Sequence, residues 1–280
     1  MAAVYREFDQ AELDREYSPS SKVADLAAEL AAYTRGSEAA YAALPVRRDL
    51  RFGEDAPELL DFFPAEGPGA PLHVFVHGGY WQELDKTDSA FAAPDFTARG
   101  TAFAAIGYGL APDWTLDRIV DQVRRGVRWL LDHAEELGVD PARIRLSGSS
   151  AGAHLVAMAL LDPAIGPRVA GAVLLSGIYD LEPIALSYVN EPLGLDAAAA
   201  RRSSPLHLPL ASLPPLLIAL GEHETAEFGR QQREFADAAR AAGVPVREIV
   251  VDGRNHFDLP LDLGRPETVL GAEVAALPGA

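Results

Sequence analysis

The spacing of hydrophobic residues changes repeatedly between two patterns after about residue 49. Short apolar runs typical of buried strands are separated by longer stretches with apolar residues on one helical face. The clearest helix is expected at 116–137, with Gly138 as its end and this buried face: Ile119, Val120, Val123, Val127, Leu130 and Leu131. Strands that alternate with helices predict a mostly parallel sheet covered by helices on both faces.

The predicted elements follow this alternation over most of the chain. Strands are expected at 50–52, 59–63, 71–76, 101–106, 142–147, 169–175, 215–220 and 246–251. Further helices are expected at 91–99, 151–161, 226–242 and 267–276. A Pro-bearing stretch at about 178–214 interrupts the pattern, and we interpret it as a cap-like insertion over the site.

The first 45 residues form a separate pattern, polar and helical, with apolar positions such as Val23, Leu26, Leu30 and Tyr33 near helical spacing. We predict that residues 1–45 are a cap or brace segment. Residues 46–280 are predicted to form a single α/β domain, because a chain of 280 residues can bury one large core.

Composition narrows the classes of function. A net charge of -17 argues against nucleic acid or an anionic membrane as partners. No run of apolar residues is long enough to span a membrane, and the start of the chain does not read as a secretory signal, so a cytoplasmic protein is expected. The chain has no cysteine, which excludes disulfides, thiolate nucleophiles and cysteine metal sites.

Two glycine-containing motifs each follow a predicted strand. The second, Gly148-Ser149-Ser150-Ala151-Gly152, is a G-x-S-x-G sequence followed by a predicted helix. Such a turn exposes a serine at the top of the sheet, where ligands of parallel sheets bind. Ser150 is therefore the candidate nucleophile.

The first motif, His77-Gly78-Gly79-Tyr80-Trp81, follows the strand at 71–76. Its backbone N–H groups can face a developing oxyanion. We expect the oxyanion hole to consist of the N–H groups of Gly78, Gly79 and Ala151. Tyr80 and Trp81 are expected to wall the substrate pocket, with an ordinary core position as the alternative.

A serine nucleophile needs a histidine base, which follows the serine in this fold type. The candidates are His154, His207, His223 and His256. His256 is favoured because it lies in a loop after the strand at 246–251. The ring of His154, one turn into the helix after Ser150, is expected to pack and not to catalyse.

The acid that orients the histidine is expected just after the strand at 215–220, within Gly221-Glu222-His223-Glu224. Glu224 is the leading candidate. The alternatives are Glu222, Glu227, Asp252 and Asp258. The sequence has no HExxH, Walker or dinucleotide motif, so we expect no metal and no cofactor.

These motifs resemble the α/β-hydrolases of the hormone-sensitive-lipase type, and most of all their kynurenine formamidase (arylformamidase) branch, which carries the HGGYW form of the first motif. The likeness covers nearly all of the chain after about residue 45. It includes the segments at 85–88, 108–112, 176–183, 221–228 and 255–258.

The resemblance implies an α/β-hydrolase fold with Ser150 as nucleophile, Glu224 as acid and His256 as base. It also implies Gly78, Gly79 and Ala151 as oxyanion donors. The chain departs from the family at two positions: Ser149 stands where histidine or aspartate is frequent, and Glu224 where aspartate is usual.

The activity that the resemblance implies is cleavage of an aryl formamide such as N-formyl-L-kynurenine through a formyl-enzyme on Ser150. A carboxylesterase for short acyl or aryl esters is the alternative with the same residues. A non-catalytic binding protein is the third hypothesis, and the complete set of catalytic residues disfavours it. The expected partner is a small-molecule substrate, and the oligomeric state stays open, with a homodimer among the options.

Overall fold

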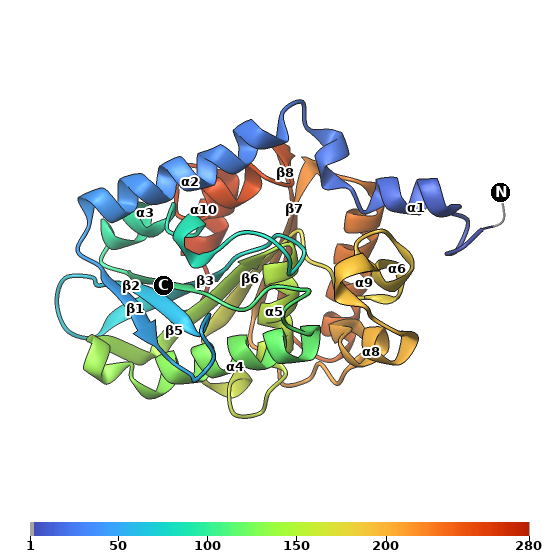
Figure 1. The fold of residues 1–280 in the computed structure, drawn as a ribbon. Helices are drawn as coiled ribbons and strands as arrows, with labels where there is room; N and C mark the ends of the chain where they lie inside the picture. Colours follow the sequence, from blue (N-terminus) through green and yellow to red (C-terminus); the bar gives the residue numbers. More distant parts are fainter. Residues whose placement is uncertain (1–2, 280) are drawn as a thin grey trace.

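The computed structural model describes residues 3–279 and contains an eight-stranded sheet (Figure 1). The strands lie in the order β1-β2-β4-β3-β5-β6-β7-β8. Strand β2 runs antiparallel to both of its neighbours, and all later pairs are parallel. The strands are β1 (Arg47–Arg51), β2 (Leu59–Phe63), β3 (Ala70–Val76), β4 (Ala102–Ile106), β5 (Val139–Ser149), β6 (Gly171–Leu175), β7 (Leu216–His223) and β8 (Val246–Asn255).

Helices cover both faces of this sheet, as predicted (Figure 1). One face carries α4 (Leu116–Asp132), α5 (Ala151–Leu160) and α9 (Ala226–Ala241). The other carries α2 (Leu26–Ala43), α3 (Ala93–Thr97) and α10 (Val269–Ala275). The alternation of side chains along a strand divides the core between these two layers. In β3, Val74 and Val76 pack into the first layer, and Phe75 packs into the second.

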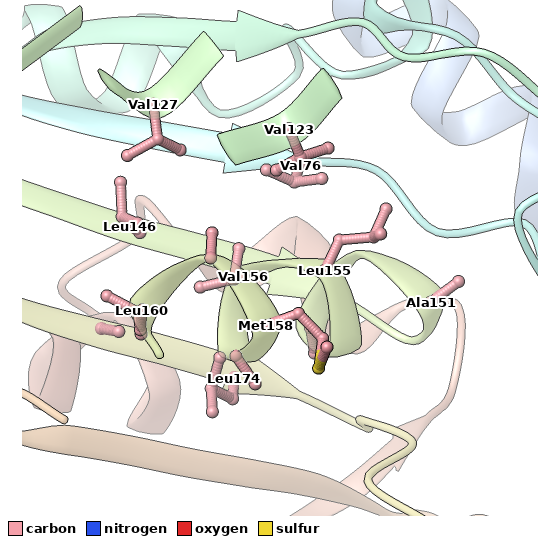
Figure 2. Packing of buried hydrophobic residues seen from close by; sticks show 14 of the residues in the cluster. Val76, Val123, Val127, Leu146, Ala151, Leu155, Val156, Met158, Leu160 and Leu174 are labelled. Atoms are coloured by element: carbon pink, nitrogen blue, oxygen red, sulfur yellow. The ribbon is translucent and has the colours of Figure 1, made fainter. Parts of the chain in front are cut away.

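The first layer surrounds α5, the helix after Ser150, and every residue of α5 is buried. Figure 2 shows Val123 and Val127 of α4 above strand residues Val76 and Leu146, and the side chains of α5 in the same buried cluster. The predicted apolar face of α4 is fully buried. Burial of each such side chain contributes about 1.5–3 kcal/mol, so this contact fixes α5 and the residue that precedes it.

Several helices are shorter than predicted. Helix α4 ends at Asp132, and a separate 3-10 turn, η3 (Glu135–Leu137), leads to Gly138, whose φ of 77° ends the segment. Helix α3 begins only at Ala93, where Pro94 provides the usual start. Helix α10 begins after the N-cap Thr268, whose side chain accepts a hydrogen bond from the Gly271 N–H (3.0 Å).

The stretch at 178–214, predicted as irregular, contains short helices. They are α6 (Glu182–Leu186), α7 (Asn190–Leu193), α8 (Ala197–Arg202) and the 3-10 turn η5 (Pro205–His207). Further 3-10 turns elsewhere in the chain are η2 (Lys86–Asp88), η4 (Gly166–Arg168) and η6 (Leu259–Asp262). These helices are too short to show a helical period in the sequence, which is why the pattern looked irregular.

The N-terminal segment forms α1 (Gln10–Glu16), the turn η1 (Pro19–Lys22) and the long helix α2. A capping box between Asp9 and Glu12 starts α1. Leu13 and Tyr17 are fully buried in the first core layer, whereas α2 packs on the opposite layer. The segment therefore crosses from one layer to the other. In residues 3–279 no helix is both long and apolar enough to span a membrane.

Candidate active site

Ser150 occupies a sharp turn between β5 and α5. Its φ of 57° and ψ of -120° place it in an unusual conformation for a residue with a side chain. A Cβ on Gly148 would lie 2.3 Å from the Gly152 carbonyl oxygen, and one on Gly152 would lie 2.1 Å from that of Val76. Only glycine therefore fits on either side of this turn. The Ser150 N–H donates to the Leu175 carbonyl (2.8 Å), which ties the turn to β6.

His256 and Glu224 meet at the same edge of the sheet. His256 follows β8 directly, and Glu224 follows β7. The His256 Nδ1 lies 2.7 Å from Glu224 Oε2, and both side chains are buried. A carboxylate only accepts hydrogen bonds, so Nδ1 carries the proton and Nε2 of a neutral ring is left as an acceptor.

Two further donors fix the Glu224 carboxylate. Its Oε1 accepts from the Ser176 hydroxyl (2.6 Å) and from the Gly221 N–H (2.8 Å). Both carboxylate oxygens are therefore engaged, and the carboxylate plane is held toward His256. No motif in the sequence marks Ser176 for this role, although its position directly after β6 brings it to the same edge of the sheet.

The alternative acids have other partners. Glu222 is half-exposed and accepts from the Gly253 N–H (2.8 Å). Glu227 pairs with Arg230 (2.7 Å), and Asp258 accepts from the backbone N–H of its neighbour Asn255 (2.7 Å). Asp252 is exposed to solvent. Of these acids, the structure places Glu224 on the histidine.

The side chains of the alternative histidines have partners other than Glu224. His207 faces Asp180 (3.4 Å), and His223 is largely exposed beside Glu222. His154 is fully buried in the first turns of α5, where it was expected to pack. Burial lowers its pKa to about 4, so its ring is neutral near pH 7.

The glycine loop after β3 passes directly over the serine. A Cβ on Gly78 would lie 2.8 Å from the Ser149 carbonyl oxygen and 3.2 Å from the Ser150 Cβ. The Tyr108 hydroxyl is 2.8 Å from the His77 carbonyl and 3.0 Å from that of Gly78. Because C=O and N–H point in opposite directions in a trans peptide, the N–H groups of Gly78 and Gly79 point away from Tyr108.

The third candidate donor is the N–H of Ala151, the first residue of α5. N–H groups in the first turn of a helix have no partner within the helix, so this group is available to a ligand. His77 supports the loop from below. Its ring stacks on Tyr108 at 4.0 Å, and its Nδ1 donates to the Gly78 carbonyl (3.0 Å). Burial lowers the pKa of His77 to about 4, which keeps it neutral.

The two aromatic residues after the glycines point to different places. Tyr80 lines the cavity that contains Ser150, and its hydroxyl donates to the Tyr17 carbonyl (2.6 Å). Trp81 is fully buried in the core and does not line that cavity. A pocket position was therefore wrong for Trp81, and its core alternative holds. The reason is its contacts: the Trp81 indole is completely buried and its Nε1–H donates to His154 Nδ1 (3.2 Å).

Ser150 and His256 both line a cavity of about 240 Å³. Its wall is mostly aromatic and aliphatic and draws on separate segments of the chain between residues 19 and 260. Among its lining residues the only charged side chains are the acids Glu83 and Asp88; neither arginine nor lysine is among those described. The main wall residues are Pro19, Leu26, Leu30, Tyr33, Phe75, Phe91, Tyr188, Phe257 and Pro260.

Helix α2 also supports the loop that carries His256. The Tyr33 hydroxyl donates to the Phe257 carbonyl, and the Asn255 side chain donates to Glu29 (3.1 Å). The Asn255 side-chain oxygen in turn accepts from the Phe257 N–H (2.7 Å). The N-terminal segment therefore both walls the cavity and braces the proposed base. Contacts between residues so far apart in sequence leave no local signal.

Within residues 3–279, His, Asp and Glu side chains nowhere form a group of three or more that could hold a metal ion.

Residues 73–258 match the model of a family described by its alpha/beta hydrolase fold. The fold and the site thus define an enzyme, a hydrolase of the α/β-hydrolase class, and the predicted fold is confirmed.

Three known proteins are similar over nearly the whole chain. Kynurenine formamidase of Danio rerio is 34% identical over 273 residues, which cover 91% of this chain and 92% of the relative. The corresponding protein of Salmo salar is 32% identical with the same coverage. A crystal structure of a candidate thioesterase from Silicibacter sp. tm1040 superposes with a TM-score of 0.85 at 30% identity, covering 95% of this chain and 99% of that one. The chain belongs to the α/β-hydrolase family, in the branch that includes the kynurenine formamidases.

Proposed function

We propose that this protein is a serine hydrolase that cleaves an aryl formamide such as N-formyl-L-kynurenine. One observation carries the reaction type: Ser150 and His256 line one cavity, and Glu224 holds the ring of His256 from behind at 2.7 Å. The formamide as substrate is supported by the likeness to kynurenine formamidases over nine-tenths of the chain.

In the proposed reaction, Nε2 of His256 takes the proton of the Ser150 hydroxyl as Oγ attacks the formyl carbon. The carbonyl oxygen becomes an oxyanion that accepts hydrogen bonds from the N–H groups of Gly78, Gly79 and Ala151. Each such donor contributes about 2.7–4 kcal/mol of transition-state stabilisation in related sites.

His256 then gives its proton to the amide nitrogen, the C–N bond breaks, and the arylamine leaves. The formyl group stays on Ser150 as an ester. Water attacks this ester while His256 takes its proton, and formate is released with the Ser150 hydroxyl restored. Glu224 keeps the imidazole oriented and stabilises its charged form in both halves of the cycle.

The cavity suits an aromatic leaving group. Phe91 stacks on Tyr33 at 5.2 Å and meets Phe75 edge-on at 5.3 Å, which builds an aromatic wall beside the serine. The acidic side chains Glu83 and Asp88 favour a neutral or cationic substituent in the cavity. A substrate carboxylate would find no cation there and is best placed at the mouth, in solvent.

An esterase acting on short acyl or aryl esters is the second candidate function. The likeness to a candidate thioesterase at 30% identity favours it, and the same residues would catalyse both reactions. Esters have better leaving groups than amides, so esterase activity alone does not separate the two proposals.

The test is the ratio of kcat/KM for N-formyl-L-kynurenine to kcat/KM for an aryl ester of similar size. A formamidase gives efficient turnover of the formamide, comparable with the ester despite the poorer leaving group. Ester hydrolysis without measurable formamide cleavage would replace the first proposal by the second.

The proposed setting is the cytoplasm, with a small molecule as substrate and neither nucleic acid nor membrane as partner. The high negative charge supports the exclusion of nucleic acid. Cell fractionation tests the location, and light scattering of the purified protein distinguishes a monomer from the homodimer left open by the sequence.

A further inference from the structure

We propose that Trp81 and His154 are positioning residues that set the spacing between the two halves of the oxyanion hole. This inference rests on the proposed function. It assigns a role to two buried polar side chains that the proposed chemistry does not itself use.

The proposed donors belong to two separate elements. Gly78 and Gly79 lie in the loop after β3, whereas Ala151 begins α5. Three N–H groups that bind one oxygen atom must keep their mutual distances within a fraction of an ångström. Something must therefore tie the loop to the first turn of the helix.

The Trp81 side chain makes this connection. Its Nε1–H donates to His154 Nδ1 (3.2 Å), and the two rings meet edge to face with centroids 5.0 Å apart. The backbone N–H of His154 in turn donates to the Ser150 carbonyl (3.2 Å). The indole thus reaches from the oxyanion loop to the helical turn that holds Ser150 and Ala151.

The hydrogen bonds of His154 define its tautomer. Its Nε2 lies 2.7 Å from the Ser203 carbonyl, which only accepts, so Nε2 carries the proton. Nδ1 is then unprotonated and accepts from Trp81. Both residues are fully buried, so an unmatched donor or acceptor would not be satisfied by water.

The conformation of the loop explains why a tie is needed. Gly79, Tyr80 and Trp81 have φ angles of 90°, 49° and 61° in succession. Residues with bulky side chains seldom adopt positive φ, and they do so where surrounding contacts hold them. Trp81 is held at its side chain by His154 and at its carbonyl by the Ala111 N–H (2.8 Å).

The test uses variants that break one hydrogen bond at a time. Trp81→Phe removes the donor but keeps an aromatic ring. His154→Asn keeps an acceptor near the position of Nδ1, whereas His154→Gln keeps a donor near that of Nε2. Trp129→Phe, on α4, is the matched control for loss of an indole.

With an activated aryl ester, we expect Trp81→Phe to lower kcat about tenfold or more, with KM within about twofold, because the spacing acts on the transition state. His154→Gln should lose as much as Trp81→Phe, and His154→Asn should recover most of the activity. The double variant Trp81→Phe/His154→Gln should be no worse than either single variant.

A second readout separates positioning from a general loss of structure. A trifluoromethyl ketone inhibitor places an oxyanion in the hole, whereas an aromatic amine product does not. Trp81→Phe should weaken the ketone by a factor similar to the loss in kcat and leave binding of the amine unchanged.

Unchanged kcat in Trp81→Phe, equal weakening of ketone and amine, or higher activity in His154→Gln than in His154→Asn would each overturn the proposal. Failure of the proposed function looks different, because the wild-type protein would then hydrolyse neither the ester nor the formamide.

Discussion

The residues proposed for catalysis and the residues of the cavity wall are held in different ways. Ser150, Glu224 and His256 each directly follow a strand. Backbone contacts and charged hydrogen bonds fix them, as at Gly152 and the Glu224 carboxylate. The wall instead consists mostly of aromatic and aliphatic side chains. They come from α2 and the turn before it, from Phe75 and Phe91, from Tyr188 and from the loop after His256.

This difference separates reaction type from substrate choice. The carboxyl ends of the strands, where Ser150, Glu224 and His256 lie, tolerate few changes. Even one added Cβ would collide with backbone at Gly148 or Gly152. Wall residues outside the sheet, such as Leu26 and Leu30 of α2, can change size with less effect on the strands. Relatives with the same sheet edge can therefore act on different acyl compounds, and changes in the two regions should have different kinetic signatures.

The largest effect is expected from Ser150→Ala. Loss of the nucleophile should lower kcat by about 10⁶ for every substrate, by analogy with other serine hydrolases. Ser149→Ala is the control, since its side chain has no part in the proposed reaction. Initial rates with formamide and ester measure both variants. More than a few per cent of wild-type activity in Ser150→Ala would assign the nucleophile elsewhere.

Glu224→Gln should lower kcat by about 10⁴, because the amide cannot stabilise the charged imidazole and can reverse its tautomer. Glu222→Gln, two residues away and half-exposed, should change kcat little. The loss in kcat should be the same for formamide and ester, because Glu224 acts in the reaction itself and not in the choice of substrate. A silent Glu224→Gln with an inactive Glu222→Gln would move the acid by two residues.

The wall should respond in specificity and not in kcat for all substrates. Asp88→Asn removes one of two acidic groups in the cavity and should raise kcat/KM for a carboxylate-bearing aryl ester about fivefold relative to a neutral one. Asp121→Asn, an exposed carboxylate on α4, is the charge-matched control. If the two variants shift the ratio equally, the effect is one of net charge and not of the cavity.

Acid should destabilise the folded protein, because the three histidines His73, His77 and His154 are buried. Burial lowers the pKa of His77 and His154 to about 4 and that of His73 well below its usual value. Histidines in the unfolded chain titrate near pH 6.5. Between about pH 6.5 and 4 the unfolded state therefore binds protons that the folded state does not.

The free energy of unfolding should accordingly be undiminished by these histidines above pH 6.5 and should fall as the pH drops toward 4. Each histidine contributes about 1.4 kcal/mol per pH unit in that window. Urea denaturation at pH 7 and pH 5 measures this loss. Between pH 7 and pH 5, His154→Asn should lose less free energy of unfolding than the wild type. The exposed control His223→Asn should lose as much as the wild type.

Sequence alone predicted the sheet edge better than the wall. Strand patterns and glycine spacing placed Ser150 at this edge. Glu224 and His256 were placed there because each follows a predicted strand, and these signals are local. Trp81 was misplaced, since its contact with His154, 73 residues away, lies in the buried core. The roles of Ser176, Tyr108 and the Tyr33 brace were missed because they depend on contacts between distant segments.

The measurement that tests the central claim most directly is identification of the acyl-enzyme. The protein is mixed with N-formyl-L-kynurenine, quenched in acid within the first turnovers, and digested for peptide mass spectrometry. We predict a formyl ester on Ser150, with the arylamine product and formate in solution, and neither adduct nor product with Ser150→Ala. Formation of the arylamine by Ser150→Ala at the wild-type rate, or a formyl group on another residue, would contradict the account.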